Sequence, residues 1–157
     1  MKKSAGLLMH RHSGDGSLQV LLAHPGGPFW RGKDEGAWTI PKGEYAPPEE
    51  ALDAAQREFT EETGFAVTPP LLPLGEITQK SGKRITAWAF AGDCDPAQLS
   101  CNTFEMEWPP RSGRKQDFPE IDRIEWFTLD EARRKIIPAQ RPLLDRLEQA
   151  LRKSGDA

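Results

Sequence analysis

Short stretches of mostly apolar or alternating residues recur along the chain and predict β-strands. Residues 5–10 and 18–23 are mostly apolar, and the turn-forming residues 13–16 lie between them, so we expect a hairpin. Residues 84–91 and 102–108 alternate between two classes of side chain, which is typical of strands with two different faces. Further strands are predicted at residues 37–40, 65–68, 74–78 and 123–127.

Three other segments favour helices. Residues 49–63 are rich in Ala, Leu, Glu, Gln and Arg, most of which stabilise helices, and Pro47 and Pro48 stand where a helix can begin. Gly64 stands where a left-handed residue would end that helix. At about 100° per residue, one apolar stripe is expected, formed by Leu52, Ala55 and Phe59. The other two helices are predicted at residues 129–136 and 140–152.

This mixture of strands and helices indicates an α/β fold, and 157 residues suit a single domain over residues 1–157. The net charge of −3 indicates no basic surface for nucleic-acid binding at the level of the whole chain. No apolar run approaches the ~20 residues of a membrane span, and residues 5–9 are too short for a signal-peptide core. We therefore expect a cytoplasmic protein, with Cys94 and Cys101 as unpaired thiols.

Charged residues and glycines at fixed spacing carry most of the functional information. They follow the pattern G-x5-E-x7-R-E-U-x-E-E-x-G-U, where U is a bulky apolar residue. The residues that fill the pattern are Gly43, Glu49, Arg57, Glu58, Phe59, Glu61, Glu62, Gly64 and Phe65. The pattern resembles the box of the Nudix hydrolases, with every defined position filled. This resemblance implies an α/β/α sandwich with a mixed curved sheet. It also implies hydrolysis of a diphosphate linkage in a nucleotide-like substrate, assisted by Mg²⁺ or Mn²⁺.

The residue types agree with that chemistry. On a helix, Glu58, Glu61 and Glu62 lie side by side, and like charges one turn apart cost about 0.2–0.5 kcal/mol per pair unless a cation lies between them. Hard oxygen ligands favour magnesium, manganese or calcium over zinc, and the chain has no paired Cys-x-x-Cys motifs. Arg57 can pair with Glu61 one turn away.

The resemblance also assigns roles to residues of the box. Glu58 and Glu62 are expected to hold the divalent cations, with the carbonyl oxygen of Gly43 as a further ligand. Arg57 would keep the carboxylates in register, and Glu49 would brace the turn into the helix.

A carboxylate from beyond the box often completes the site in this family. Residues 119–126 resemble the segment that supplies it in RNA pyrophosphohydrolases and dinucleoside polyphosphate hydrolases, since Glu120 precedes Trp126 by six positions. Glu120 is therefore expected to bind metal, and either Glu120 or Glu61 to orient or deprotonate the attacking water. The rival candidates, which share one face of a predicted strand, are Glu105 and Glu107.

A nucleotide substrate needs cations for its phosphates and aromatic rings for its bases. For the phosphates we expect Lys42, Lys83 and Arg84. For the bases, the candidates on predicted loops are Trp30 and Tyr45, with Phe29 and Phe118. Four further cations lie on predicted loops, where they could bind phosphate or only keep the protein soluble: Arg31, Lys33, Arg111 and Arg114. The tryptophans expected in the core are Trp38, Trp88 and Trp126.

Two further features bear on the substrate. Residues 38–44 resemble the tryptophan-proline-lysine-glycine entry of the tetraphosphate hydrolases, and Lys83 before an aromatic strand matches them too. They favour dinucleoside polyphosphates such as diadenosine tetraphosphate. The alternatives are an RNA 5′-pyrophosphohydrolase, a nucleoside triphosphate pyrophosphohydrolase and a non-catalytic nucleotide-binding module. The basic residues 111–115, within a loop predicted at residues 109–117, favour RNA, whereas the negative net charge counts against it. Oligomeric state and metal preference stay open.

Overall fold

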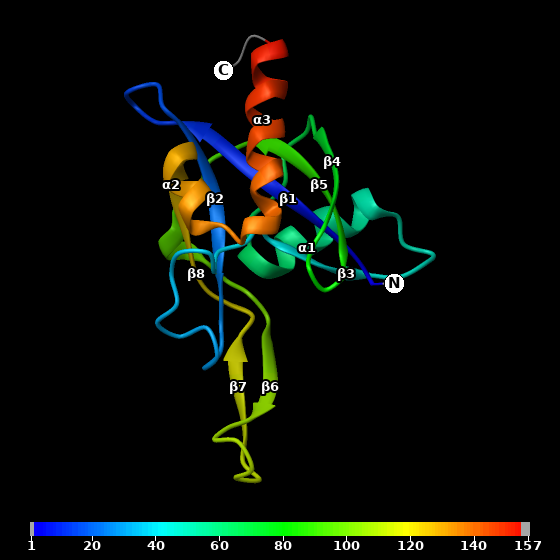
Figure 1. Cartoon of the computed structure of the whole chain (residues 1–157), viewed down its shortest axis with the longest axis vertical. Coiled ribbons are helices and arrows are strands. Elements are labelled where there is room, and N and C mark those ends of the chain that lie inside the picture. The colour runs from blue at the N-terminus through cyan, green and yellow to red at the C-terminus, as the bar shows by residue number, and fades with distance from the viewer. Residues whose placement is uncertain (1, 155–157) are drawn as a thin grey trace.

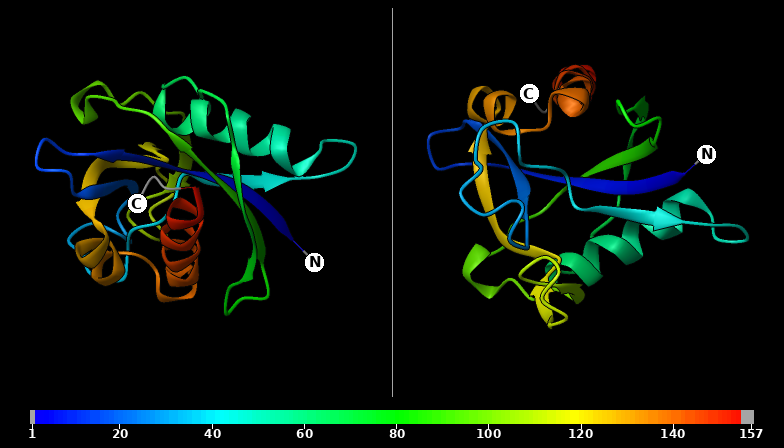
Figure 2. Two further views of the ribbon diagram at one scale, coloured as in Figure 1. Left: turned by 90° about the horizontal axis from the view of Figure 1, so that it is seen from above. Right: turned by 60° about the horizontal axis from the view of Figure 1, so that its bottom comes forward.

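The computed structural model describes residues 2–154 and places a mixed sheet between helices (Figures 1 and 2). The strands of this sheet are β1 (Lys3–His12), β2 (Leu18–Pro25), β3 (Lys42–Tyr45), β4 (Leu72–Thr78), β5 (Arg84–Ala91) and β8 (Ile121–Thr128). A second sheet consists of β6 (Thr103–Glu107) and β7 (Lys115–Pro119). The helices are α1 (Ala51–Thr63), α2 (Leu129–Lys135) and α3 (Arg141–Ser154), with 3-10 turns at Pro96–Gln98 and Pro138–Gln140.

Strand β1 organises the main sheet because three other strands pair with it. Its first residues pair antiparallel with β3, from Lys3 opposite Tyr45 to Gly6 opposite Lys42. Its last residues pair antiparallel with β2, and β5 runs parallel to it along its other edge. The order along the sheet is therefore β4-β5-β1-β2-β8. The pairing with β3 brings Lys42 and Gly43 to the start of β1.

Both faces of the sheet are buried, which gives the molecule two cores. Alternate residues of a strand point to opposite faces. The side packed by α2 and α3 receives Leu8, Val20 and Leu22, and the side packed by α1 receives Leu7, Met9 and Leu21. Figure 2 shows α1 and α3 on opposite sides of β1. The predicted α/β/α sandwich with a mixed sheet is confirmed.

Most predicted elements are found, with shifted ends. The hairpin is longer than predicted and spans β1 and β2, while β5 has the predicted bounds. Helix α1 begins at Ala51 rather than at Glu49, and Gly64 ends it with a φ of 82°. Ala55 and Phe59 are buried as predicted, but Leu52 is 37% exposed because the buried side of α1 passes through Ala54 instead. Both cysteines are unpaired.

Two predicted strands are wrong. Residues 37–40 form only isolated bridges, because Thr39 bonds to Ala23 of β2 while Trp38 bonds to the end of α2. Residues 65–68 are irregular, because they follow the left-handed Gly64 and run into Pro69 and Pro70, which have no N–H to donate to a ladder.

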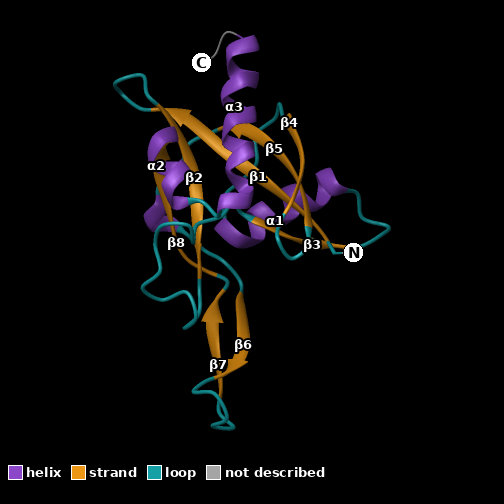
Figure 3. Cartoon of the chain, viewed as in Figure 1, coloured by secondary structure: helices purple, strands orange, loops and turns teal. Residues whose placement is uncertain are grey.

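The predicted loop at residues 109–117 is also partly wrong, since Lys115–Pro119 forms β7 and pairs with β6. We call β6, β7 and the turn between them the arm. Figures 1 and 3 show the arm projecting away from the main sheet. Phe104 lies opposite Phe118, with ring centroids 6.0 Å apart, and Phe118 is 9% exposed. The prediction of Phe118 as a loop residue that stacks on a base is therefore corrected, because its ring packs inside the arm.

Candidate functional site

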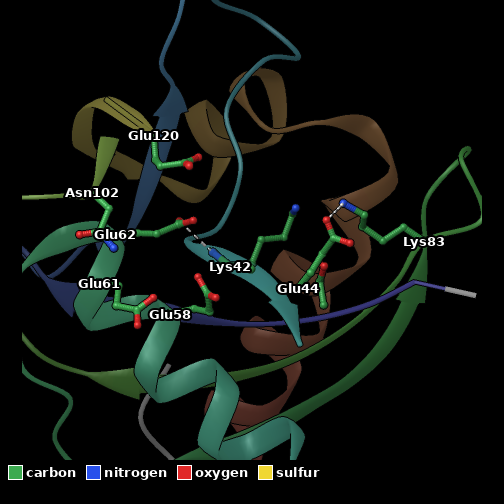
Figure 4. Close-up of a pocket in the computed structure, with 10 residues that line it drawn as sticks. Lys42, Glu44, Glu58, Glu61, Glu62, Lys83, Asn102 and Glu120 are labelled. Carbon is green, nitrogen blue, oxygen red and sulfur yellow. Dashed lines mark hydrogen bonds and ion pairs between the residues drawn. The ribbon is translucent and has the colours of Figure 1, made fainter. Parts of the chain in front are cut away.

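A polar pocket of about 430 Å³ lies where α1, β1 and β3 meet the base of the arm (Figure 4). Its lining residues are Ser4, Lys42, Gly43, Glu44, Glu58, Glu61, Glu62, Lys83, Asn102 and Glu120. The cations Lys42 and Lys83 lie towards one end, and Glu120 and Asn102 lie towards the other (Figure 4). The pocket therefore has a basic end and an acidic end.

Helix α1 supplies three of the carboxylates at helical spacing. Phe59 is fully buried against the sheet, which orients the helix so that the neighbouring Glu58 faces the pocket. Gly43 lies so close to Glu58 that a Cβ atom at position 43 would overlap its carboxylate. The backbone N–H of Lys42 donates to Oε2 of Glu62 at 3.2 Å. A side chain at position 43 would therefore displace the Glu58 carboxylate from the position it takes beside β3.

Arg57 joins the carboxylates on the rim of this helix. Its Nε and Nη2 donate to the two oxygens of Glu49, both at 2.8 Å. Its Nη1 donates to Glu58 at 2.9 Å and to Glu61 at 3.1 Å. The guanidinium lowers the pKa of the Glu49 carboxyl below its ordinary value. Arg57 thus connects the loop before α1 to two carboxylates of the pocket, and the predicted pairing with Glu61 is confirmed.

Burial and charge repulsion dominate the electrostatics of the pocket. Burial, and then the charges of Glu58 and Glu120, raise the pKa of Glu62 to about 8. Burial also raises the pKa of Glu58, although the neighbouring Arg57 opposes the shift. Burial and the nearby Lys83 lower the pKa of Lys42. The carboxylates at the acidic end thus carry unfavourable charge that a cation would neutralise.

The donor set fits a hard divalent cation. Carboxylate oxygens and the Gly43 carbonyl are the ligands that Mg²⁺ and Mn²⁺ prefer, and no cysteine or histidine lines the pocket as described. Among residues 2–154, no three acidic, histidine or cysteine side chains already form a metal-ligand group. Glu58 and Glu62 are one turn apart beside Gly43, so these three residues are the ones that would hold the ion.

The rival acids differ in where they lie. Glu120 lines the pocket from the junction of β7 and β8. Glu105 and Glu107 lie on the arm, where Glu105 is 3.7 Å from the ammonium of Lys115 and Glu107 accepts the backbone N–H of Arg111 at 2.7 Å. Neither lines the pocket, so only Glu120 is placed to act with the carboxylates of α1.

Several predicted substrate-binding residues lie outside the pocket as described. Arg84 is 3.8 Å from Glu76, the ring of Tyr45 packs against the core beneath α1, and Trp30 lies under the ammonium of Lys33. Lys42 and Lys83 do line the pocket. Of the tryptophans expected in the core, Trp38 is fully buried, while Trp88 and Trp126 are partly buried against it.

Three lining residues had no signal in the sequence. Ser4 and Glu44 are brought together by the pairing of β1 with β3, in which they lie opposite each other. Glu44 also lies 3.7 Å from the ammonium of Lys83 and 3.9 Å from that of Lys2. Asn102 reaches the pocket because its carbonyl accepts the N–H of Glu120. Each depends on strand pairing between distant residues, which no local pattern reveals.

Comparison with known proteins assigns the chain to a family. The model of the NUDIX domain matches residues 2–147. The chain belongs to the Nudix family. A curated relative, the RNA pyrophosphohydrolase of Rhizobium meliloti (strain 1021), is 28% identical over 119 residues, and the match covers 66% of this chain and 66% of that protein. The chain thus spans just under two thirds of that relative's length.

Solved structures of Nudix proteins share the fold of this chain. The binary complex of the C. elegans Ap4A hydrolase superimposes with a TM-score of 0.67 at 22% identity, covering 98% of this chain and 99% of that one. The NUDIX domain of Shewanella oneidensis NrtR, complexed with ADP ribose, gives a TM-score of 0.63 at 14% identity, covering 95% of this chain and 87% of that one. At these low sequence identities, the structural similarity shows a shared fold and nothing more.

Within the described residues of this Nudix protein, no helix is both long and apolar enough to cross a bilayer.

Proposed function

We propose that this Nudix protein is a divalent-metal-dependent hydrolase of diphosphate linkages in nucleotide derivatives. The observation that carries the proposal is the composition of one pocket, in which five glutamates lie with two lysines. Glu44 lies 3.7 Å from the ammonium of Lys83. The other four glutamates are Glu58, Glu61, Glu62 and Glu120, and the second lysine is Lys42. Carboxylates that hold a divalent cation, next to ammonium groups that bind phosphate, are the parts that phosphoric anhydride hydrolysis requires.

Each group of the pocket has a role in this proposal. A bound Mg²⁺ or Mn²⁺ ion would neutralise charge on the phosphates and on the attacking water. Glu58, Glu62 and the carbonyl of Gly43 would hold it. Glu61 or Glu120 would orient the attacking water and accept its proton, as general bases within hydrogen-bond reach do. Arg57 would keep the carboxylates of α1 in register through its bonds to Glu58 and Glu61.

The basic end of the pocket would bind the phosphates. Lys83 lies on the rim and Lys42 is more deeply buried, so the two ammonium groups can contact successive phosphates of one chain. Each lysine acts as a point charge, which tolerates several phosphate geometries. A substrate with three or more phosphates would use both.

Among such substrates we propose dinucleoside polyphosphates first, with diadenosine tetraphosphate cleaved asymmetrically to ATP and AMP. Two observations support this choice. Residues 38–44 resemble the segment that leads into the box of the tetraphosphate hydrolases, and Lys83 lines the pocket. The shared fold with a protein named Ap4A hydrolase agrees with it. Nucleoside triphosphates remain a further candidate, and the filled box argues against a non-catalytic module.

RNA 5′ ends are the second candidate, and the arm is the observation that favours them. Phe29 is 63% exposed, and its ring meets that of Trp108 at the far end of the arm, with centroids 6.0 Å apart. Arg111 and Arg114 lie on the exposed turn, and their side chains have no acidic partner among residues 2–154. An exposed aromatic ring packed on the arm, together with unpaired cations on its turn, suits a single nucleic-acid strand. The curated relative named RNA pyrophosphohydrolase agrees with this candidate.

A substrate panel tests the proposal. Diadenosine tetraphosphate, ATP, dATP, ADP-ribose and a 5′-triphosphorylated RNA are compared at equal concentration, with Mg²⁺ and with Mn²⁺. We expect the highest kcat/KM for diadenosine tetraphosphate, with ATP and AMP as products. A kcat/KM at least tenfold higher for the RNA, about 1.4 kcal/mol of preference, would instead select the second candidate. No turnover of any compound with either metal would refute the enzymatic function. The cytoplasmic location stays a prediction.

A further inference from the structure

The backbone of Glu120 is held from both sides by segments distant in sequence. Its N–H donates to the carbonyl of Asn102 at 2.9 Å, at the base of the arm. Its carbonyl accepts the N–H of Gly26 at 2.9 Å, just beyond the end of β2. Glu120 itself lies between β7 and β8 and belongs to neither strand. These two hydrogen bonds therefore set where its side chain enters the pocket.

Gly26 provides one of these bonds because it has no side chain. A Cβ atom at this position would overlap the carbonyl oxygen of Pro119, the residue before Glu120, and would lie 3.0 Å from the carbonyl carbon. Both are backbone atoms, so the chain must move either at Pro119 and Glu120 or at Gly26, and either shift would disturb the hydrogen bond between Gly26 and Glu120. The φ of Gly26 is not positive, so glycine is needed at position 26 because a Cβ atom has no room there, and not because of the backbone conformation.

His24 connects the same two segments through its side chain. The ring is 2% exposed, with Nδ1 2.9 Å from Oδ1 of Asp122 and Nε2 2.6 Å from the carbonyl oxygen of Lys33. The register of β2 against β8 is irregular between His24 and Pro25, and Pro25 then lies opposite Ile121. The ring thus ties the end of β2 to the start of β8, two residues after Glu120.

We propose that Gly26 and His24 are positioning residues for Glu120. They hold its peptide so that the carboxylate faces Glu58 and Glu62 from the other side of the pocket (Figure 4). The proposal rests on the proposed function, in which Glu120 takes part in metal binding or water activation. Neither residue lines the pocket, and neither belongs to the box motif, so their effect would act through Glu120.

Gly26→Ala tests this, with Gly14→Ala as its matched control. Gly14 has no positive φ, and a Cβ atom there would meet nothing within 4 Å. We expect Gly26→Ala to lower kcat for diadenosine tetraphosphate at least tenfold with KM changed less than threefold. Calorimetric titration should show weaker Mn²⁺ binding. Gly14→Ala should match the wild type in all three quantities. Wild-type kcat and Mn²⁺ affinity in a folded Gly26→Ala protein would overturn the proposal.

A double-mutant cycle separates positioning from a general loss of structure. In the Glu120→Gln background, Gly26→Ala should change kcat and Mn²⁺ affinity less than twofold, because the group it positions is already removed. His24→Gln, which cannot reach both partners of the imidazole, should lower kcat at least threefold and show the same loss of effect in that background. It provides the same test if Gly26→Ala does not fold.

The outcomes of the cycle identify which idea fails. If Gly26→Ala and His24→Gln change kcat and Mn²⁺ affinity by the same factors in the Glu120→Gln background as in the wild type, the positioning role is overturned. The proposed function would stay intact. Full activity of Glu120→Gln itself would remove Glu120 from the proposed function, and the positioning role with it. If no substrate is turned over, the Mn²⁺ titrations alone decide whether Gly26 acts through Glu120.

Discussion

Partial burial and two neighbours of the same charge raise the pKa of Glu62, so a bound cation should affect this residue strongly. We predict that Glu62→Gln lowers kcat by at least 100-fold, because an anionic metal ligand contributes several kcal/mol of transition-state stabilisation. Glutamine has a similar helix propensity, so the thermal midpoint should not fall. Turnover and thermal unfolding measured on one preparation check both statements.

Glu50→Gln is the matched control for this substitution. Glu50 is exposed at the start of α1, and its side chain makes no capping hydrogen bond. Its variant should keep wild-type turnover. If Glu62→Gln also kept near-wild-type turnover in saturating Mg²⁺, the assignment of Glu62 as a metal ligand would be wrong.

The pKa of Glu62 also predicts how the stability of the metal-free protein depends on pH. Its pKa is about 8 in the folded chain, against an ordinary value of 4.5. Between these values the folded state binds more protons than the unfolded state, so the free energy of unfolding falls as pH rises. We expect the thermal midpoint in EDTA to fall from pH 5 to pH 8.

The same measurement on Glu62→Gln isolates this residue, since glutamine does not titrate. The variant should show a flatter pH profile than the wild type. Saturating Mg²⁺ should also flatten the wild-type profile, because the ion stabilises the ionised carboxylate that burial disfavours. Parallel profiles for the wild type and the variant in EDTA would contradict the raised pKa.

At the scale of elements, the arm is the part of the chain that small substrates are least able to reach. Asn102 and Trp108 are six positions apart, which at about 3.3 Å per strand residue places the far end about 20 Å from the pocket. Stacked nucleotides of one strand are about 3.4 Å apart, so roughly six would cover that distance. The tip of the arm should therefore affect a long RNA and leave a dinucleotide unaffected.

Arg111→Glu combined with Arg114→Glu tests this role of the arm. We predict a fall in kcat/KM of tenfold or more for a 5′-triphosphorylated RNA of ten nucleotides, and less than twofold for diadenosine tetraphosphate. Since contacts to phosphate are screened by salt, the wild-type preference for the longer RNA should weaken as salt increases. Equal effects on both substrates would show that the arm acts on the pocket itself.

The local sequence pattern predicts some of the strands and fails for others. The alternation of residues 84–91 predicts β5 because its two faces meet different surroundings. Residues 115–119 carry mixed charges and a proline, and they form β7 only because β6 is available to pair with them. Residues 65–68 look like a strand but pair with no strand in the described part of the chain, since they leave α1 through Gly64. Pairing partners, rather than propensity, decide these segments.

At the scale of the whole molecule, Asp34 links a loop, the core and α2. It accepts the indole N–H of the fully buried Trp38 at 2.9 Å, and its other oxygen pairs with Lys135. We predict that Asp34→Ala lowers the free energy of unfolding by about 1–3 kcal/mol, because the buried indole N–H loses its partner. Chemical denaturation measures this loss directly.

Asp34→Asn is the informative comparison for that prediction. Asparagine can still accept the indole N–H but loses the ion pair with Lys135, which is worth little at an exposed site. It should therefore retain most of the stability. A loss as large for asparagine as for alanine would mean that the ion pair, and not the indole bond, stabilises the loop.

The amino-acid sequence alone determines the class of chemistry and the part of the site that lies on α1. The side chains of Glu58, Glu61 and Glu62 are neighbours on any helix, because residues three and four apart share a face. Arg57 lies on the same helix, so its contact with Glu58 follows from spacing too, whereas only the resemblance to the Nudix box implies that Gly43 lies beside them. The resemblance to the Nudix box likewise implies a sheet with helices on both sides.

Only the tertiary structure decides which distant groups complete the pocket. The sequence favours Glu120 only through the resemblance of residues 119–126, and Glu107 stays its rival. In the structure the arm carries Glu107 away from the pocket, while Asn102 and Gly26 hold Glu120 in place. The same holds for Lys83 and Arg84, adjacent residues of which only Lys83 lines the pocket. Strand pairing brings such residues together across tens of positions, and its register is set by packing of the whole sheet.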